Sequence, residues 1–186
     1  MNRRSALLLL ACAGPLAGCA SAALQTGGLD HAAGAPYTLA SGDRLRIIVF
    51  GQDNLSNIYA VDGSGRIVMP LIEAIPVAGM STIQAARAIE GRLKGGYLRE
   101  PKVTVEIETY RPFFILGEVT TSGQFPFVNG MTVQTAVAIA GGFTPRAART
   151  YAEISRASSD GIVTAAVPIT YPVRPGDTIV IKERWF

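Results

Sequence analysis

The residues best suited by type and spacing to catalysis are Glu106 and Glu108, which alternate along a segment with a strand pattern. Alternate strand residues share a face, and glycosidases use two carboxyl groups to cleave a sugar linkage. The sequence gives neither glutamate an apolar surrounding that would raise its pKa, so a solvated strand face is the favoured interpretation. A sugar-cleaving enzyme is therefore the least favoured function.

Other reaction centres are limited by composition. The 186 residues include one histidine, His31, and two cysteines, Cys12 and Cys19, too few for a zinc finger, a Cys/His metal cluster or a disulfide scaffold. A catalytic triad would have to use His31, which lies in a Gly/Ala-rich segment. No Gly-x-x-x-x-Gly-Lys-Ser/Thr phosphate loop occurs. We expect no metal, no cofactor and no enzymatic activity.

The first 18 residues have the features of a secretion signal. Arg3 and Arg4 precede an apolar run far shorter than the roughly 20 residues that span a bilayer. The sequence Leu16-Ala17-Gly18-Cys19 resembles the lipobox of bacterial lipoproteins, in which cleavage exposes a cysteine that accepts a diacylglyceryl group. We therefore expect lipidation at Cys19. An ordinary signal peptide with an incidental cysteine is the less favoured alternative.

The charge balance argues against a nucleic-acid partner. Cleavage before Cys19 removes two of the 17 basic residues and leaves 15 against 14 acidic ones, a net charge of about +1. The basic excess of the whole sequence therefore does not indicate a nucleic-acid surface. Residues 19–35 are rich in alanine and glycine, which is typical of a flexible tether between a lipid and a domain.

The pattern then predicts a first unit, residues 36–110, with one helix. A capping box of Ser81 and Gln84 starts this helix, and Gly95-Gly96 ends it. Its buried face is expected at residues spaced three or four apart: Ile83, Ala86, Ile89, Leu93 and Tyr97. Strands are expected at 43–50, 58–61, 66–69, 75–77 and 102–109, with 58–61 and 66–69 paired as a hairpin.

A second unit is predicted over residues 111–186. Thr132 caps a helix that runs to Ala140, with Val133, Ala136, Val137 and Ala140 facing inward. Strands are expected at 113–119, 124–128, 150–156, 162–167 and 178–183. The fold class is α+β, with a small mixed sheet and one main helix in each unit. Similar Gly-Asp and helix-start segments in both units favour two related units.

Glycines and aspartates mark the expected turns. Asp43 and Asp177 each follow a glycine at the start of a strand, where a carboxylate can accept from turn N–H groups. Asparagine should therefore replace either one mildly, whereas alanine should cost about 1 kcal/mol. The expected structural turn residues are Gly42, Asp43, Asp62, Gly65, Gly117, Gly123, Gly141, Gly142, Gly176 and Asp177.

As an ordered set, these motifs resemble the polysaccharide biosynthesis/export family of outer-membrane lipoproteins. In the first unit the resemblance is carried by residues 37–45, by Asp62 with Gly65, by Pro70-Leu71-Ile72 and by Glu100-Pro101. In the second unit it is to the soluble-ligand-binding β-grasp (SLBB) repeat of the same proteins. The matching residues there are Leu116-Gly117-Glu118-Val119, Ser122-Gly123, Ala140-Gly141-Gly142, Ala147 and Pro175-Gly176-Asp177-Thr178-Ile179.

Two features of the sequence differ from the usual pattern of the family: the residue at position 73 and the chain end. Glu73 lies where the family usually has glycine, which leaves the conformation of that turn open. Larger members continue into further repeats and an amphipathic membrane helix, so the ending at Trp185-Phe186 resembles a short class without its own pore. These two aromatic residues at a charged chain end are candidates for docking.

The resemblance implies a lipoprotein on the periplasmic face of the outer membrane, anchored through Cys19. It implies a ring homo-oligomer, an octamer, that forms part of a conduit for an exopolysaccharide or capsule. The implied partners are the exported polysaccharide, an inner-membrane polysaccharide co-polymerase and a separate outer-membrane pore protein. The alternative is a monomeric periplasmic lipoprotein that binds a small ligand or sugar through its β-grasp domain.

Overall fold

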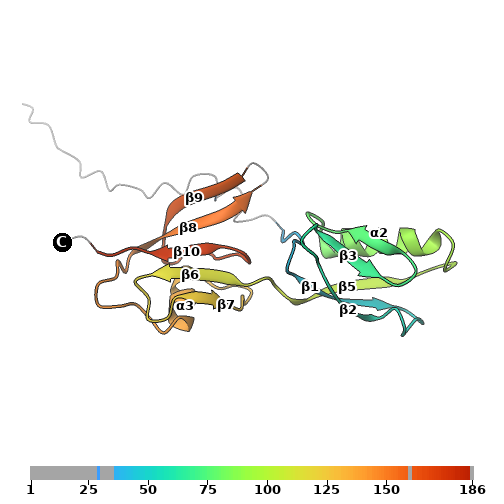
Figure 1. Cartoon of the computed structure of the whole chain (residues 1–186), viewed down its shortest axis with the longest axis horizontal. Coiled ribbons are helices and arrows are strands. Elements are labelled where there is room, and N and C mark those ends of the chain that lie inside the picture. The colour runs from blue at the N-terminus through green and yellow to red at the C-terminus, as the bar shows by residue number, and fades with distance from the viewer. Residues whose placement is uncertain (1–28, 30–35, 159–160, 185–186) are drawn as a thin grey trace, which may run out of the picture.

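Two lobes lie side by side along the long axis of the computed structural model, which describes Leu29, residues 36–158 and residues 161–184 (Figure 1). The first lobe comprises residues 36–109 and the second residues 113–184. Residues 110–112 connect them between the last strand of the first lobe and the first strand of the second. The described residues therefore form an α+β protein of two units.

The first lobe is built from antiparallel strand pairs and one helix. A three-stranded sheet has the order β2-β1-β5, and a separate hairpin pairs β3 with β4. The elements are β1 (Arg44–Val49), β2 (Asn57–Ala60), β3 (Arg66–Met69), β4 (Glu73–Pro76), α2 (Thr82–Lys94) and β5 (Val103–Thr109). The predicted strands exist, but the predicted hairpin of 58–61 with 66–69 is wrong, because β2 pairs with β1 and β3 with β4.

The helix α2 begins at the predicted capping box, in which Ser81 Oγ accepts from Gln84 N at 3.2 Å and Gln84 Oε1 from Ser81 N at 2.8 Å. Its buried face differs from the prediction. Ala85, Ile89 and Leu93 are buried, whereas Ile83 and Tyr97 are 65% and 54% exposed. The helix packs on β5 and its buried residues share one core with residues of β3 and β4, and a helical periodicity alone does not specify on which side such partners lie.

Glu73 lies where the resembled family usually has glycine, and its backbone adopts the left-handed conformation that favours glycine. Its φ is 57°, and Leu71 in the same turn has φ 72°. Glu73 nevertheless pairs with Met69 at the start of the β3–β4 ladder. The turn therefore contains a non-glycine residue whose left-handed backbone conformation costs free energy.

The second lobe is a five-stranded mixed sheet of order β7-β6-β10-β8-β9, with one helix. Only β10 and β6 are parallel among its described pairs. The elements are β6 (Phe113–Gly117), β7 (Gly123–Phe125), α3 (Val133–Ile139), β8 (Tyr151–Ser158), β9 (Gly161–Pro168) and β10 (Thr178–Ile181). The predicted mixed sheet is therefore found in this lobe, whereas the described pairs of the first lobe are antiparallel.

The core of the second lobe lies between α3 and one face of the sheet. The helix buries Val133, Ala136 and Val137, with Ala140 directly after it, as predicted. Leu29, 1% exposed, also belongs to this core. The expectation of a flexible tether therefore does not hold at Leu29, while the other residues of 19–35 lie outside the described part of the chain.

The sheets of the two lobes differ, with a three-stranded sheet and a separate hairpin in the first lobe and one five-stranded sheet in the second. A Gly-Asp pair nevertheless leads into the central strand of each main sheet, β1 in the first lobe and β10 in the second. The same turn chemistry thus serves the same place in both sheets, and the relatedness of the two units stays a prediction. None of the helices in the described part of the chain combines the length and apolar character that a bilayer crossing requires.

Candidate functional site

Two turns of the same design lead into β1 and β10. Asp43 N donates to Ala40 O at 3.2 Å, and Asp177 N donates to Arg174 O at 3.1 Å. In return, the carboxylate oxygen Oδ2 of each aspartate accepts from the N–H three residues earlier, at 2.9 Å and 2.7 Å. Gly42 and Gly176 have φ of 93° and 84°, as the third residue of a type II turn requires.

Asp43 is fully buried and is held by donors from both sides of the lobe boundary. Its two oxygens accept from the Tyr37 hydroxyl at 2.8 and 2.6 Å, and Oδ1 also accepts from Arg111 N at 2.9 Å. Burial, followed by the hydrogen bond to Asp43, raises the pKa of Tyr37 well above its ordinary value. The Tyr37 hydroxyl therefore stays protonated and serves as a donor.

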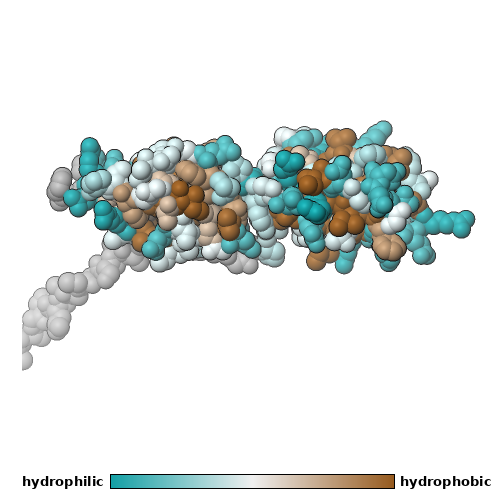
Figure 2. Space-filling view, turned by 90° about the horizontal axis from the view of Figure 1, so that it is seen from below, coloured by the Kyte–Doolittle hydropathy of each residue, from teal (hydrophilic) through white to brown (hydrophobic). Residues whose placement is uncertain are grey.

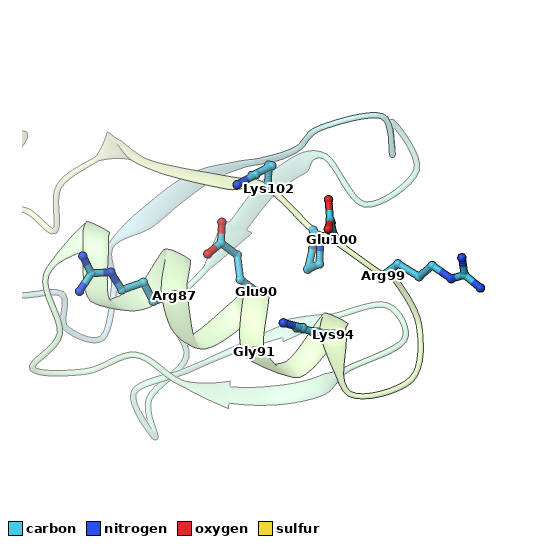
Figure 3. Close-up of a pocket in the computed structure, with 8 residues that line it drawn as sticks. Arg87, Glu90, Gly91, Lys94, Arg99, Glu100 and Lys102 are labelled. Atoms are coloured by element: carbon cyan, nitrogen blue, oxygen red, sulfur yellow. The ribbon is translucent and has the colours of Figure 1, made fainter.

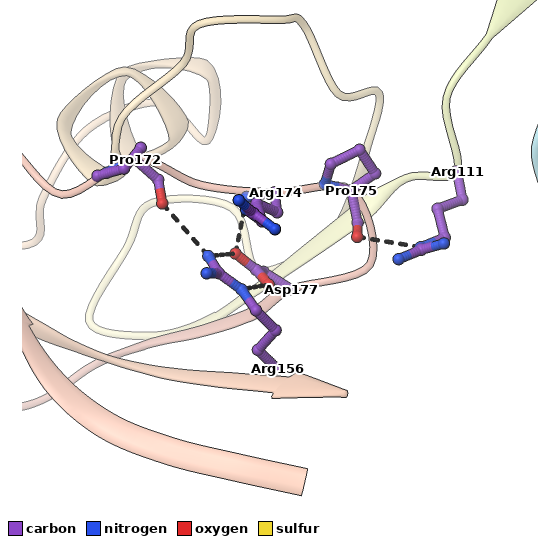
Figure 4. Close-up of polar contacts among 6 residues, drawn as sticks. All are labelled: Arg111, Arg156, Pro172, Arg174, Pro175 and Asp177. Carbon is purple, nitrogen blue, oxygen red and sulfur yellow. Dashed lines mark hydrogen bonds and ion pairs between the residues drawn. The ribbon is translucent and has the colours of Figure 1, made fainter. Parts of the chain in front are cut away.

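Asp177 is also fully buried but is paired with a cation (Figure 4). Arg156 donates from Nε to Oδ1 at 2.8 Å and from Nη2 to Oδ2 at 2.7 Å, the bidentate geometry that suits guanidinium and carboxylate. Burial acts to lower the pKa of Arg156, but the hydrogen bonds and charge of Asp177 outweigh it, so the net pKa is raised. Arg156 therefore stays positively charged beside Asp177.

Arg111, in the segment between the lobes, connects the two turns. Its backbone N–H reaches Asp43, and its side-chain Nε donates to Pro175 O at 3.0 Å (Figure 4). The contact is close, since a Cβ added to Gly176 would lie 2.5 Å from Arg111 Nε. Among the described residues, the buried Nη1 of Arg111 has no hydrogen-bond partner. Arg111 thus holds the first strand of one lobe against the last strand of the other.

The hydrogen bonds at this junction fix the positions of the two turns. In each aspartate both carboxylate oxygens accept from N–H groups, so an asparagine would turn its own NH₂ toward a donor. Mild replacement by asparagine, expected from the sequence, does not follow from this geometry.

The remaining expected turn residues lie at separate places. Asp62 Oδ1 accepts from Ser64 N at 2.8 Å and from Arg66 N at 3.0 Å, and these bonds lower its pKa, the one to Arg66 most. Gly117 has φ 87° and would place a Cβ against Ile181 O. Positive φ is also found at Gly65, Gly123, Gly141 and Gly142.

Glu106 and Glu108 lie on the exposed face of β5, as the favoured interpretation predicted. Arg46 pairs with Glu108, with its Nη2 2.7 Å from Oε2. Cys19, His31, Trp185 and Phe186 lie outside the described residues, so lipidation and docking stay predictions.

A charged hollow of about 440 Å³ lies beside the C-terminal half of α2 (Figure 3). Glu90 is turned toward the segment that carries Lys102, where its Oε1 accepts from Val103 N at 2.9 Å, while Arg99 extends away from the other labelled side chains. The charged side chains do not converge on one point, so this hollow has the features of a solvated surface. Its lining includes Arg87, Glu90, Lys94, Arg99, Glu100 and Lys102.

The sequence interpretation missed the roles of Arg111 and Arg156. A signal existed for Arg156, because it continues the inward-facing series of Ala152 and Ile154 on β8 and therefore had to be buried with a partner. Arg111 carries no comparable local signal, since its contacts come from turns 68 and 64 residues away in the chain.

Comparisons with known proteins fit this two-lobed arrangement. Residues 31–108 match the family model described as polysaccharide biosynthesis/export protein, and residues 112–164 match the SLBB domain. The exopolysaccharide production protein ExoF of Rhizobium meliloti (strain 1021) is 31% identical over a region covering 65% of this chain. The chain spans about a third, 32%, of the length of that relative. The boundary between the two matched segments falls at the connection that carries Arg111, and the chain carries a domain of the polysaccharide biosynthesis/export family.

Proposed function

We propose that this protein takes part in the export of an exopolysaccharide or capsule, as a component of a conduit in the periplasm. The observation that carries the proposal is the occurrence, in one chain, of an export-family lobe followed by an SLBB lobe. The relative named for exopolysaccharide production is 31% identical over 133 residues and supports the same role. The second lobe is proposed to be β-grasp-like, and the protein is proposed not to be an enzyme.

The proposed location is the periplasmic face of the outer membrane, with a lipid on Cys19. Leu29, which is buried in the second lobe, lies ten positions after Cys19. A fully extended chain covers at most about 3.6 Å per residue, so the lipid would lie within roughly 36 Å of Leu29. This reach favours a second lobe that lies close to the membrane surface.

A ring of identical copies is the proposed assembly. Both lobes expose apolar side chains on the outer faces of their sheets, including Ile48 and Phe50 in the first lobe and Phe114 and Leu116 in the second. Figure 2 shows apolar areas on each lobe in a single view. Exposed apolar surface of this kind favours association. The proposed partners are further copies, the polymer, an inner-membrane co-polymerase and an outer-membrane pore protein.

The proposal is tested by deletion and complementation in the producing bacterium. Loss of the protein should abolish secreted polymer while polymer or its precursors accumulate in the cell, and the full chain should restore secretion.

Two further measurements test the anchor and the assembly. Cys19→Ser should fail to restore secretion, and intact mass should show a lipidated chain that starts at Cys19. Light scattering of the protein in mild detergent should give a multiple of the monomer mass. Unchanged secretion in the deletion strain would exclude an export role, and a monomer mass at all concentrations would favour the alternative of a monomeric ligand-binding lipoprotein.

A further inference from the structure

A cleft of about 320 Å³ opens where the two lobes meet. Tyr37 and Tyr110 line it from the first lobe and the connection, whereas Phe127, Asn129 and Arg174 line it from the second lobe. Its size is at the lower end of the range for small-molecule sites, and sites of this kind often lie between domains.

The wall of the cleft contains three aromatic rings in contact. The ring centroids of Tyr37 and Tyr110 are 5.1 Å apart with an interplanar angle of 82°, and those of Tyr110 and Phe127 are 5.4 Å apart at 72°. All three side chains are half-buried, so each keeps some exposed ring surface. Aromatic faces carry negative partial charge and attract the polarised C–H groups of a sugar ring, which makes such a wall suited to a saccharide.

The lining of the cleft also contains polar side chains, among them the amide of Asn129 and the guanidinium of Arg174. Arg174 lines the cleft between Pro172 and Pro175 (Figure 4), and Arg111 lies behind the lining, with its guanidinium 5.9 Å from the Tyr37 ring centroid. The two nearby carboxylates, Asp43 and Asp177, are buried and already accept the hydrogen bonds described above. Arg156 is paired with Asp177, so Arg174 is the side chain that brings a cation to the lining of the cleft.

The state of Arg174 supports this assignment. Burial, followed by the charge of Arg156, lowers the pKa of Arg174 below its ordinary value. A desolvated cation beside another cation is stabilised when an anion binds next to it.

We infer that the cleft binds a sugar unit that carries a carboxylate, with the ring against Tyr37, Tyr110 or Phe127 and the carboxylate near Arg174. This inference rests on the proposed function, since the polymer under export would be the source of the sugar. It makes the junction between the lobes a contact point for an acidic polysaccharide.

The experiment compares two disaccharides that differ only in charge, cellobiouronic acid and cellobiose, by calorimetry with the full-length protein in mild detergent. The wild type should bind the acidic sugar more tightly. Arg174→Gln should weaken binding of the acidic sugar about tenfold, the effect of losing a charge-assisted hydrogen bond, and leave binding of cellobiose unchanged. Phe127→Leu should weaken binding of both sugars.

Matched controls lie on the far side of the first lobe. Arg99→Gln and Tyr97→Leu remove an exposed cation and an exposed ring outside the cleft and should leave both affinities unchanged. Thermal unfolding of each variant shows whether the fold is intact. Failure of the wild type to bind either sugar would overturn the inference, and so would equal binding of both sugars that Arg174→Gln does not alter. Neither result touches the export role, which is measured independently by secretion from the deletion strain.

Discussion

Arg111 donates its backbone N–H to Asp43 Oδ1 at 2.9 Å while its side-chain Nε donates to Pro175 O at 3.0 Å. One residue of the connecting segment therefore contacts the turn before β1 and the turn before β10. Gly176 N adds a bond to Pro112 O at 3.0 Å next to it. The lobes are held by directed hydrogen bonds at this junction, and the loss of one side chain should loosen it.

Arg111→Ala should lower the free energy of unfolding by about 1–3 kcal/mol, because it removes the bond to Pro175 O and the packing on Tyr37. Calorimetry should also show the unfolding of the two lobes moving towards two separate transitions, since the variant loses one of the bonds that link them. Arg111→Lys should give an intermediate result, because an ammonium does not reproduce the directed guanidinium N–H. The exposed Arg149→Ala serves as control, and an Arg111→Ala trace identical to it would show that Arg111 does not couple the lobes.

Asp177→Asn should destabilise the protein more than Asp43→Asn. The first change leaves Arg156 as a buried cation without a counter-ion, which costs about 3–5 kcal/mol. The second turns an amide NH₂ toward a backbone N–H, which costs about 1–3 kcal/mol. Urea unfolding measures both.

A double variant provides the control for the ion pair. Adding Arg156→Met to Asp177→Asn removes the uncompensated cation, so the double variant should be more stable than Asp177→Asn alone. Equal costs for the two single asparagine variants would show that the Arg156 charge contributes little.

Gly117→Ala should cost much more stability than Gly79→Ala. Both glycines have positive φ, 87° and 78°, so the backbone strain of an alanine is similar. A Cβ at Gly117 meets the Ile181 carbonyl oxygen of the neighbouring strand, whereas nothing lies within 4 Å of one at Gly79. Thermal unfolding of the two variants isolates the cost of the contact, and equal midpoints would mean that β6 and β10 can separate at no cost.

Glu73→Gly should raise the stability by about 0.5–1 kcal/mol, because glycine adopts a φ of 57° without steric cost. Glu73→Ala removes the same charge but keeps the strain, so it should bring no gain. Urea unfolding distinguishes the two, and a gain for alanine equal to that for glycine would assign the effect to the charge instead.

Local patterns predicted the elements well. The capping box of α2, the Thr132 cap of α3 and the inward face of α3 follow from residues a few positions apart, and such contacts leave periodic traces in the sequence. The face of α2 was partly misplaced because Ile83 and Tyr97 fit the helical spacing but lie largely exposed to solvent.

Pairing and junctions were less predictable. The turn at Asp62 gives the correct local geometry, but whether β2 pairs with β1 or with β3 depends on cores that form over long distances. The aspartates at positions 43 and 177 look equivalent in the sequence. Only the fold shows that one of them faces a tyrosine hydroxyl and the other an arginine.

The place of β10 in its sheet bears on the order in which the chain folds during synthesis. The first lobe has all its strands by Thr109, so it can fold while the rest of the chain is still being made. The second lobe cannot close its sheet in this way, because β10, the last of the described strands to be synthesised, lies between β6 and β8. Until β10 arrives, the β6–β7 and β8–β9 pairs expose edges that favour association with other chains. The chain is therefore most vulnerable to aggregation just before β10 is available.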